Sequence, residues 1–302
     1  MAHMTTLLRC LICIVPLAAS TRALAQKDTY LAYLKHNQQA LVLSSQGEHA
    51  AALAEFETAF AVYPWVQSDY FEAVLSALMA GDAERANRFL SEGVRHGFTP
   101  EAFYDSTYTA HLQGDAPVPF REQWHQDKLA FAAGADSALI EELDVMVVLD
   151  QFVRTSGANE ERMAEADYTN FEHLIAICQR NGMPSSRTIG HHYGSMFLLL
   201  WHHRGPEYPA SAQWKRMLPF IHQAIDAGEL SPAFLCAFDD MSDYHAGRPM
   251  RYGVLVDYFS PTGHIKLIAR DELNRNRASV GLETIEDYAK REGLDLDAIL
   301  EH

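Results

Sequence analysis

The stretch GEHAAALAEFETAFAVYP at residues 47–64 predicts a helical repeat, because its pattern returns 34 residues later as GDAERANRFLSEG at 81–93. Four pairs of residues match at this spacing: Gly47 with Gly81, Ala52 with Ala86, Phe56 with Leu90, and Ala59 with Gly93. A repeat of this length is typical of paired helices, with glycine at the turn and small residues where two helices touch. The pattern predicts helices at about 30–45, 50–62, 67–79 and 83–96.

This unit resembles the tetratricopeptide repeat, in which a proline such as Pro64 closes each unit. The resemblance implies helical hairpins at 26–98, and repeats of this kind bind peptides or partner proteins in a concave groove. Two units are fewer than the roughly three that an independent solenoid needs, so we expect the pair to pack on the C-terminal part of the chain. Two interpretations stay open: the pair binds a partner, or it is only a scaffold for the next domain.

Residues 1–25 have the pattern of a secretory signal peptide. Arg9 is the only charge before the apolar run at 10–19, and Ala23-Leu24-Ala25 is a small-x-small cleavage sequence. This order of segments predicts export, to the periplasm or outside the cell, with cleavage after Ala25. The apolar run is too short to cross a bilayer, so we expect no integral membrane segment after cleavage. An uncleaved anchor or a cytosolic leader is the alternative.

The composition excludes one large class of partners. The 302 residues include 24 Lys and Arg against 40 Asp and Glu, a formal net charge of −16. Such an acidic chain repels phosphate, which argues against nucleic-acid binding through a basic patch. The charge instead favours basic or neutral partners.

Cysteine use and short motifs predict no cofactor and no metal. Signal-peptide cleavage leaves only Cys178 and Cys236, too few for a disulfide framework, and whether these two pair stays open. The sequence contains no His-Glu-x-x-His, no calcium loop and no phosphate-binding Gly-rich loop. Gly194-Ser195 lacks the second glycine of a nucleophile elbow, so nucleophilic catalysis has no support.

The second half of the chain carries a series of short motifs. They are Asp150-Gln151-x-x-Arg154, Asp167-x-x-Asn170, Gly182-Met183-Pro184, Ile189-Gly190, an apolar helix ending at His202, a Leu235…Asp239 element, Gly247-x-x-Met250-x-Tyr252-Gly253 and Asn274-x-x-Arg277-x-x-x-Gly281-Leu282. From about residue 143 onward, this series resembles a bacterial domain family of unknown function whose members are often exported or attached to other modules. The resemblance implies a domain at 137–302, but it implies no activity.

The chain departs from the family pattern at several polar positions. Where the family tends to have Gln-x-Tyr-Gly-Thr-Gln, this sequence has apolar residues at Met250, Val254 and Leu255. The family's Gln-His at the end of the apolar helix is Trp201-His202 here. If the polar residues line a pocket in relatives, the resemblance implies that this chain has a more apolar pocket or has lost the site.

Seven residues of these motifs are the candidates for a ligand pocket: Asp150, Arg154, Asp167, Asn170, His202, Asp239 and Tyr252. A small-ligand site needs converging polar groups, so the prediction requires these side chains to meet in one cleft. Structural roles are the alternatives for three of them. Asp150 and Arg154 have the i, i+4 spacing of an ion pair on one helix face, and Asp167 has the position of an N-cap residue.

An enzymatic function would depend on His202. His191 lies 11 residues earlier, and on one helix this spacing separates the two by about 16 Å, so they cannot share a metal ion. A general acid–base pair of His202 with Asp150 or Asp239 remains open.

A long-range metal site remains a further alternative for His202. It would use the acidic group that contains Asp239, Asp240, Asp243 and His245, although a solvated acidic turn is the simpler interpretation of that group. Because repeats indicate partners and no catalytic motif is present, we expect a protein- or peptide-binding role. A hydrolase-like or metal-assisted enzyme with His202 as acid, base or ligand is the alternative.

The expected fold is mainly α: tetratricopeptide-like helical hairpins packed on a helical domain with one small β-hairpin. A connecting segment at 99–136 contains a turn-rich linker at 111–119. The remaining predicted helices lie at about 120–133, 137–154, 170–180, 194–203, 212–227 and 285–292. The β-branched and aromatic run at 251–259, the turn at 260–263 and the run at 264–268 predict the hairpin.

Overall fold

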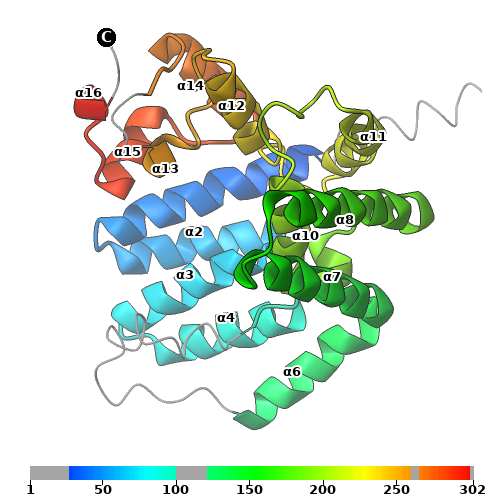
Figure 1. The fold of residues 1–302 in the computed structure, drawn as a ribbon. Coiled ribbons are helices and arrows are strands. Elements are labelled where there is room, and N and C mark those ends of the chain that lie inside the picture. The colour runs from blue at the N-terminus through cyan, green and yellow to red at the C-terminus, as the bar shows by residue number, and fades with distance from the viewer. Residues whose placement is uncertain (1–26, 100–120, 260–264, 300–302) are drawn as a thin grey trace, which may run out of the picture.

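The computed structural model describes residues 27–99, 121–259 and 265–299. Within these ranges the protein is mainly helical, as the sequence predicts, and contains no β-strand (Figure 1). The predicted signal peptide at 1–25 and the predicted linker at 111–119 lie outside the described residues. None of the helices in the described ranges is both long and apolar enough to cross a membrane.

A helix at residues 27–45 comes first. The later elements are α2 (His49–Val62), α3 (Gln67–Met79), α4 (Ala83–Arg95), α6 (Arg121–Gly134), α7 (Ser137–Thr155), α8 (Glu160–Asn181), α9 (Ser186–Ile189), the 3₁₀ turn η2 (Gly190–His192), α10 (Tyr193–Trp201), α11 (Ala212–Asp226), α12 (Cys236–His245), α13 (Val256–Phe259), α14 (Arg270–Ser279), α15 (Ile285–Glu292) and α16 (Leu296–Ile299).

The first four helices form two hairpins at the positions that the 34-residue period predicts. Gly47 and Gly81 sit in the turns with φ of 79° and 73°, a backbone conformation that glycine adopts without strain. Gly93, which the repeat aligns with Ala59, has to be small, because a Cβ there would lie 2.8 Å from a ring atom of Tyr70. The hairpins agree with the predicted helices, and the likeness to the tetratricopeptide repeat stays a prediction.

Helix α6 continues this row of helices by packing on α4 (Figure 1). The buried carboxylate of Asp127 joins the two, since it accepts hydrogen bonds of 2.6 Å from Ser91 Oγ and 2.6 Å from Arg95 Nε. The two predicted repeats therefore do not stand alone. We expected them to pack on the following part of the chain, because two units are too few for an independent solenoid.

Two glycines bring the two helical hairpins of residues 27–99 against the second half of the chain. Gly97 and Gly190 both have positive φ, and a Cβ on Gly97 would lie 2.6 Å from the Cα of Gly190 and 2.8 Å from the ring of Phe131. The backbone N–H of His191 donates to the carbonyl of Gly97 at 3.1 Å. Gln67 adds a side-chain bridge by donating to the carbonyls of His96 and Ser186. Such close backbone contact is open only to residues without a side chain.

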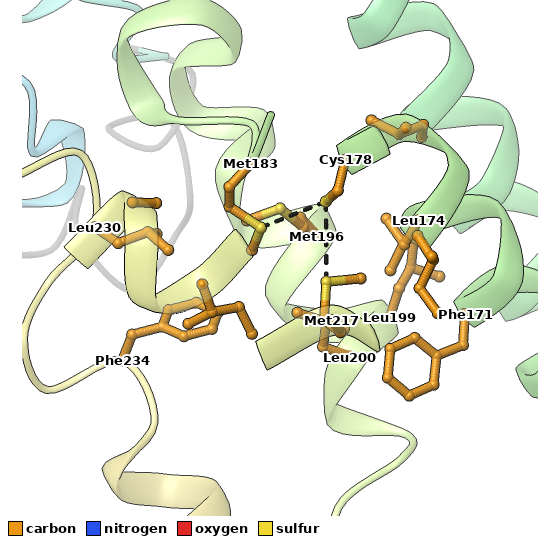
Figure 2. Packing of buried hydrophobic residues seen from close by; sticks show 14 of the residues in the cluster. Phe171, Leu174, Cys178, Met183, Met196, Leu199, Leu200, Met217, Leu230 and Phe234 are labelled. Carbon is orange, nitrogen blue, oxygen red and sulfur yellow. Dashed lines mark hydrogen bonds between the residues drawn. The ribbon is translucent and has the colours of Figure 1, made fainter. Parts of the chain in front are cut away.

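The central core lies between α7, α8, α10 and α11 (Figure 2). Cys178 of α8 points at Met183 and Met217, with sulfur–sulfur separations of 3.6 Å and 3.8 Å. Trp214 is fully buried, and its indole N–H donates to the carbonyl of His203 at 2.9 Å. Cys178 and Cys236 are both free and buried, so the structure contains no disulfide between them. Burial raises the pKa of the Cys178 thiol to about 12, which keeps it protonated and unreactive.

The last part of the chain is held by two buried charged residues. Asp240 of α12 accepts hydrogen bonds from the backbone N–H groups of Arg251, Tyr252 and Val254, all between 2.9 and 3.0 Å. Arg277 of α14 donates to the carbonyls of Tyr252 and Glu283. Residues of the Tyr252-Gly253 and Asn274-x-x-Arg277 motifs therefore help to fix one loop against two helices.

The predicted β-hairpin is wrong. Residues 256–259 form helix α13, and the isolated parallel bridge found in the described residues joins Met250, just before the first run, to Leu267. The reason is that the Asp240 carboxylate accepts hydrogen bonds from backbone N–H groups of the first run, at Arg251, Tyr252 and Val254. Gly253, with φ of 64°, also turns the backbone away from an extended path. The predicted turn at 260–263 lies outside the described residues.

The prediction for the start of α8 is also wrong. The helix begins at Glu160 and not near residue 170, because the side chain of Asn159 caps it by accepting from the N–H of Arg162 at 3.0 Å. Asp167 therefore lies within the helix and is no N-cap. His191 and His202 do not share one α-helix either, because the 3₁₀ turn η2 precedes α10.

Candidate functional site

Five of the seven candidate residues meet where α7, α8 and the end of α10 come together. Asp150 and Arg154 extend from α7, Asp167 and Asn170 from α8, and His202 comes directly after the last turn of α10. We call this group the Asp150 cluster. It unites three motifs that are up to 52 residues apart in the sequence.

Asp150 is the centre of the cluster and is 1% exposed. His202 Nδ1 lies 3.1 Å from Asp150 Oδ1 and 3.8 Å from Asp167 Oδ1. Arg154 donates to Asp150 Oδ2 from Nε at 3.3 Å, and its terminal nitrogen donates to the carboxylate of Asp167. One guanidinium thus bridges two carboxylates that come from different helices.

Neutral side chains complete the surroundings of Asp150. Gln151 Nε2 donates to Asp150 Oδ2 at 2.7 Å, and Asn170 Nδ2 lies 3.5 Å from Asp150 Oδ1. The neighbouring His203 holds the backbone of α8, with Nε2 2.7 Å from the carbonyl of Asp167. These contacts fix the orientation of the carboxylates, because each acceptor oxygen of Asp150 has at least two partners.

Burial sets the protonation of the cluster. It lowers the pKa of His202, against the opposing effect of the Asp150 and Asp167 carboxylates, and thereby favours the neutral imidazole. Burial also raises the pKa of Asp167, although the nearby Arg154 works in the other direction. A neutral imidazole beside a buried carboxylate has the form of either an acid–base pair or a metal ligand.

Asp239 and Tyr252 do not join the Asp150 cluster. Asp239 accepts from Tyr208 Oη at 3.0 Å and lies 3.7 Å from Arg251 Nη1, while the backbone of Tyr252 bonds to Asp240 and Arg277. Within the described residues, no hydrogen bond or ion pair links either of them to the cluster. Five of the seven candidates therefore form one bonded group, and a single cleft that contains all seven stays a prediction.

The acidic group at 239–245 is no solvated turn. It lies on α12, and Asp240 and Asp243 are 0% and 3% exposed. Arg251 Nε donates to Asp243 Oδ2 at 2.8 Å, and Arg248 also pairs with that carboxylate. These contacts make the group part of the packing of the last helices.

The apolar residues Met250, Val254 and Leu255 have a packing role. All three belong to the apolar cluster beneath α12, α14 and α15, where Met250 is almost fully buried. Trp201 contacts this cluster and the central one, and its ring lies 5.3 Å from that of Phe238. These three apolar side chains thus help to fill an apolar core.

A second candidate surface lies on the outer side of α7. Val145, Val148, Leu149 and Phe152 are 53%, 66%, 58% and 65% exposed, and we call these four side chains the α7 face. Their i, i+3, i+4, i+7 spacing places them on one side of the helix. Val145, Val148 and Leu149 also line a hollow of about 460 Å³.

The hollow beside the α7 face is mainly apolar. Helix α6 contributes Phe131 and Ala132, and α7 contributes Ile140. The acidic side chains in its lining are Glu141 and Asp144. Sequence reasoning missed this surface because 137–154 is apolar on several sides, so periodicity did not separate the buried positions from the exposed ones.

Comparison of the chain with protein-family models, curated proteins and solved structures gave no match.

Proposed function

We propose that this protein is a partner-binding protein that docks a helical segment of another protein on the α7 face and the adjoining hollow. The segment has one apolar side, formed by residues at i, i+3, i+4 and i+7 spacing, and Lys or Arg along its edges. The observation that carries the proposal is the exposure of four large apolar side chains on one helix face. Clustered exposed apolar residues of this kind mark interaction surfaces.

The position of the docking surface differs from the one that the repeat resemblance implies. In the described part of the repeat pair, Met79 is the large apolar side chain with more than half of its surface exposed. On α7 four such side chains stand together, and Leu129 of α6 is a further one at 52%. Among the described residues, the apolar surface offered to a partner is therefore concentrated on α6 and α7 rather than on residues 27–98.

Charge defines the edges of the partner. Glu141 is exposed and Asp144 is half-exposed, and both border the hollow. His192 Nδ1 lies 2.7 Å from Asp144, so Glu141 is the carboxylate of the two with its surface open to a partner's cation. Together with the net charge of −16, this border favours Lys and Arg at the edges of the docked segment.

Apolar burial sets the scale of the affinity. Covering one fully exposed large apolar side chain contributes about 1.5–3 kcal/mol. The four residues of the face are 53–66% exposed, so covering their remaining surface contributes roughly 4–7 kcal/mol before the cost of association. The cost of association is at least about 4 kcal/mol, so the face alone supplies at most about 3 kcal/mol of net binding free energy, and the apolar side of the docked segment has to supply the rest.

The test is a binding titration with a designed probe. A fluorescently labelled helical peptide with leucines at i, i+3, i+4 and i+7 and lysines at its edges is titrated with the full chain, and a second peptide carries glutamates in place of the lysines. The chain is compared with a triple variant, Val148→Ser, Leu149→Ser and Phe152→Ser. Met79→Ser is the matched control, since it removes an equally exposed apolar side chain elsewhere.

The expected result is saturable binding of the lysine peptide to the wild type and to Met79→Ser, with binding weakened by salt. The triple variant is expected to lose at least about tenfold in affinity. Unchanged binding to the triple variant, or equal binding of the glutamate peptide, contradicts the proposal. Dimerisation of the wild type that the triple serine change abolishes, measured by analytical ultracentrifugation, would identify a second copy as the occupant and likewise overturn it.

Export and family relationships are part of the proposal. The leader pattern supports export with cleavage after Ala25, the 34-residue period supports tetratricopeptide-like repeats, and the ordered motifs support the bacterial domain family. N-terminal sequencing of the chain expressed with its leader tests the first of these. A mature N-terminus at Gln26 is expected, and an uncleaved chain would contradict export by this route.

Catalysis at His202 is the second candidate function. The contact of 3.1 Å between its Nδ1 and the buried carboxylate of Asp150 favours it, because a carboxylate can orient an imidazole for proton transfer. His202→Ala is expected to abolish a turnover found by substrate screening while the thermal melt stays intact. Retention of that turnover would exclude His202 as the acid or base.

A further inference from the structure

The Asp150 cluster holds three metal-ligating side chains in reach of one another. One ligand atom from each of Asp150, Asp167 and His202 lies within 4.8 Å of the other two. They come from α7, α8 and the end of α10. The packing of these helices therefore brings them together, and no local sequence motif does. This is why the sequence shows no metal-binding spacing at these residues.

The separations fit the ligand shell of a small divalent cation. Zinc-type sites place nitrogen and oxygen ligands about 2.0–2.2 Å from the ion, which puts neighbouring ligand atoms roughly 3.3 Å apart. In the structure, His202 Nδ1 is 3.1 Å from Asp150 Oδ1 and 3.8 Å from Asp167 Oδ1. Gln151 and Asn170 bond to the Asp150 carboxylate, as the supporting residues of metal ligands do.

A guanidinium nitrogen already contacts the same two oxygens. Arg154 Nη2 donates to Asp167 Oδ1 and lies 3.5 Å from Asp150 Oδ1. The side chain of Arg154 is 27% exposed, whereas that of Asp150 is 1% exposed, so the arginine is the partner that can withdraw toward solvent. Its single positive charge faces two carboxylates, and a divalent cation would balance both.

We propose that Asp150, Asp167 and His202 form a binding site for a divalent transition-metal cation of the zinc class, and that Arg154 and the cation are alternative occupants of it. The cation binds through one oxygen of each carboxylate and Nδ1 of His202, and solvent supplies the remaining ligand. On binding, Arg154 leaves the carboxylates, and any proton on Nδ1 passes to solvent. The inference is independent of docking on the α7 face.

The experiment is a titration of the full chain with Zn²⁺ by isothermal calorimetry, with Co²⁺ as a spectroscopic substitute. The variants are Arg154→Gln, which removes the competing cation, and Asp167→Asn, which removes one ligand and keeps its shape. Glu84→Gln is the control, because this exposed carboxylate lies on α4, outside the cluster and the α7 face. Circular dichroism confirms that each variant is folded.

One site per chain is expected in the wild type, with affinity at least about tenfold higher in Arg154→Gln and lost in Asp167→Asn. The Co²⁺ complex is expected to show a visible spectrum of low-symmetry coordination, and Glu84→Gln should behave as the wild type. Should Arg154→Gln fail to bind tighter than the wild type, competition with arginine is wrong. One-site binding that survives in Asp167→Asn places the cation on other histidines and overturns the site.

Discussion

Gly97→Ala tests how the two helical hairpins of residues 27–99 are joined to the helices that carry the Asp150 cluster. Gly97 has φ of 92°, and a Cβ there would lie 2.6 Å from the Cα of Gly190 and 2.8 Å from two ring atoms of Phe131. The Gly190 backbone cannot turn away as a flexible side chain would, because His191 donates to the carbonyl of Gly97.

Two effects add in this variant. A non-glycine residue in a left-handed conformation costs about 1–2 kcal/mol, and forcing one extra carbon into a packed contact costs about 1–3 kcal/mol. The free energy of unfolding should therefore fall by roughly 2–5 kcal/mol, relief by backbone movement giving the lower end.

The assay is urea-induced unfolding followed by circular dichroism, with Gly194→Ala as the control. Gly194 lies in α10, and nothing is within 4 Å of the position of its added Cβ. The control should be unchanged or gain up to about 1 kcal/mol from helix propensity. A loss below about 0.5 kcal/mol for Gly97→Ala would refute the close backbone contact as a determinant of stability.

Three further predictions concern protonation, the buried acid and the thiols. Burial lowers the pKa of His202 below its usual 6.5, so the unfolded chain binds more protons than the folded chain, and stability from this group is lost as pH falls through 6.5. With EDTA present, the stability of the wild type relative to His202→Gln should therefore be greater at about pH 7.5 than at about pH 5.5. A relative stability that rises toward low pH would contradict the lowered pKa of His202. Asp240→Asn should cost roughly 1–3 kcal/mol in chemical unfolding, because the N–H of Val254 loses its acceptor, and an unchanged midpoint would show that this carboxylate does not hold the loop. Thiol titration, without reductant, of a chain that begins at Gln26 should detect Cys178 and Cys236 only after denaturation, and no thiol in the denatured chain would indicate a disulfide.

Local patterns in the sequence were enough to predict most helices. The 34-residue period located α2, α3 and α4, and the helical boundaries at 212 and 285 result from capping by Ser211 and Thr284. These features depend on neighbouring residues alone. The prediction failed at residues 251–259, where β-branched and aromatic residues form a loop and a short helix. The reason is that Asp240, on another helix, accepts hydrogen bonds from three backbone N–H groups of this run.

The candidate site was predicted in part. The motif residues on α7, α8 and α10 were identified from the sequence, as was the i, i+4 pair of Asp150 and Arg154. The contacts of Asp150 with His202 and of Arg154 with Asp167 depend on how three helices pack. Asp239 and Tyr252 belong to a different set of contacts for the same reason. The outer side of α7 was not predicted, because Val148 and Leu143 look alike in the sequence while one is exposed and the other fully buried.

The most direct test of partner docking on α7 is an NMR titration of methyl-labelled protein with the lysine-edged helical peptide. We predict saturable shift changes at the methyl groups of Val145, Val148 and Leu149, with Leu143, on the buried side of the same helix, changing far less. Shift changes that map to residues 27–99 and spare the α7 face would contradict the account, as would the absence of any saturable change at a peptide concentration well above the micromolar range.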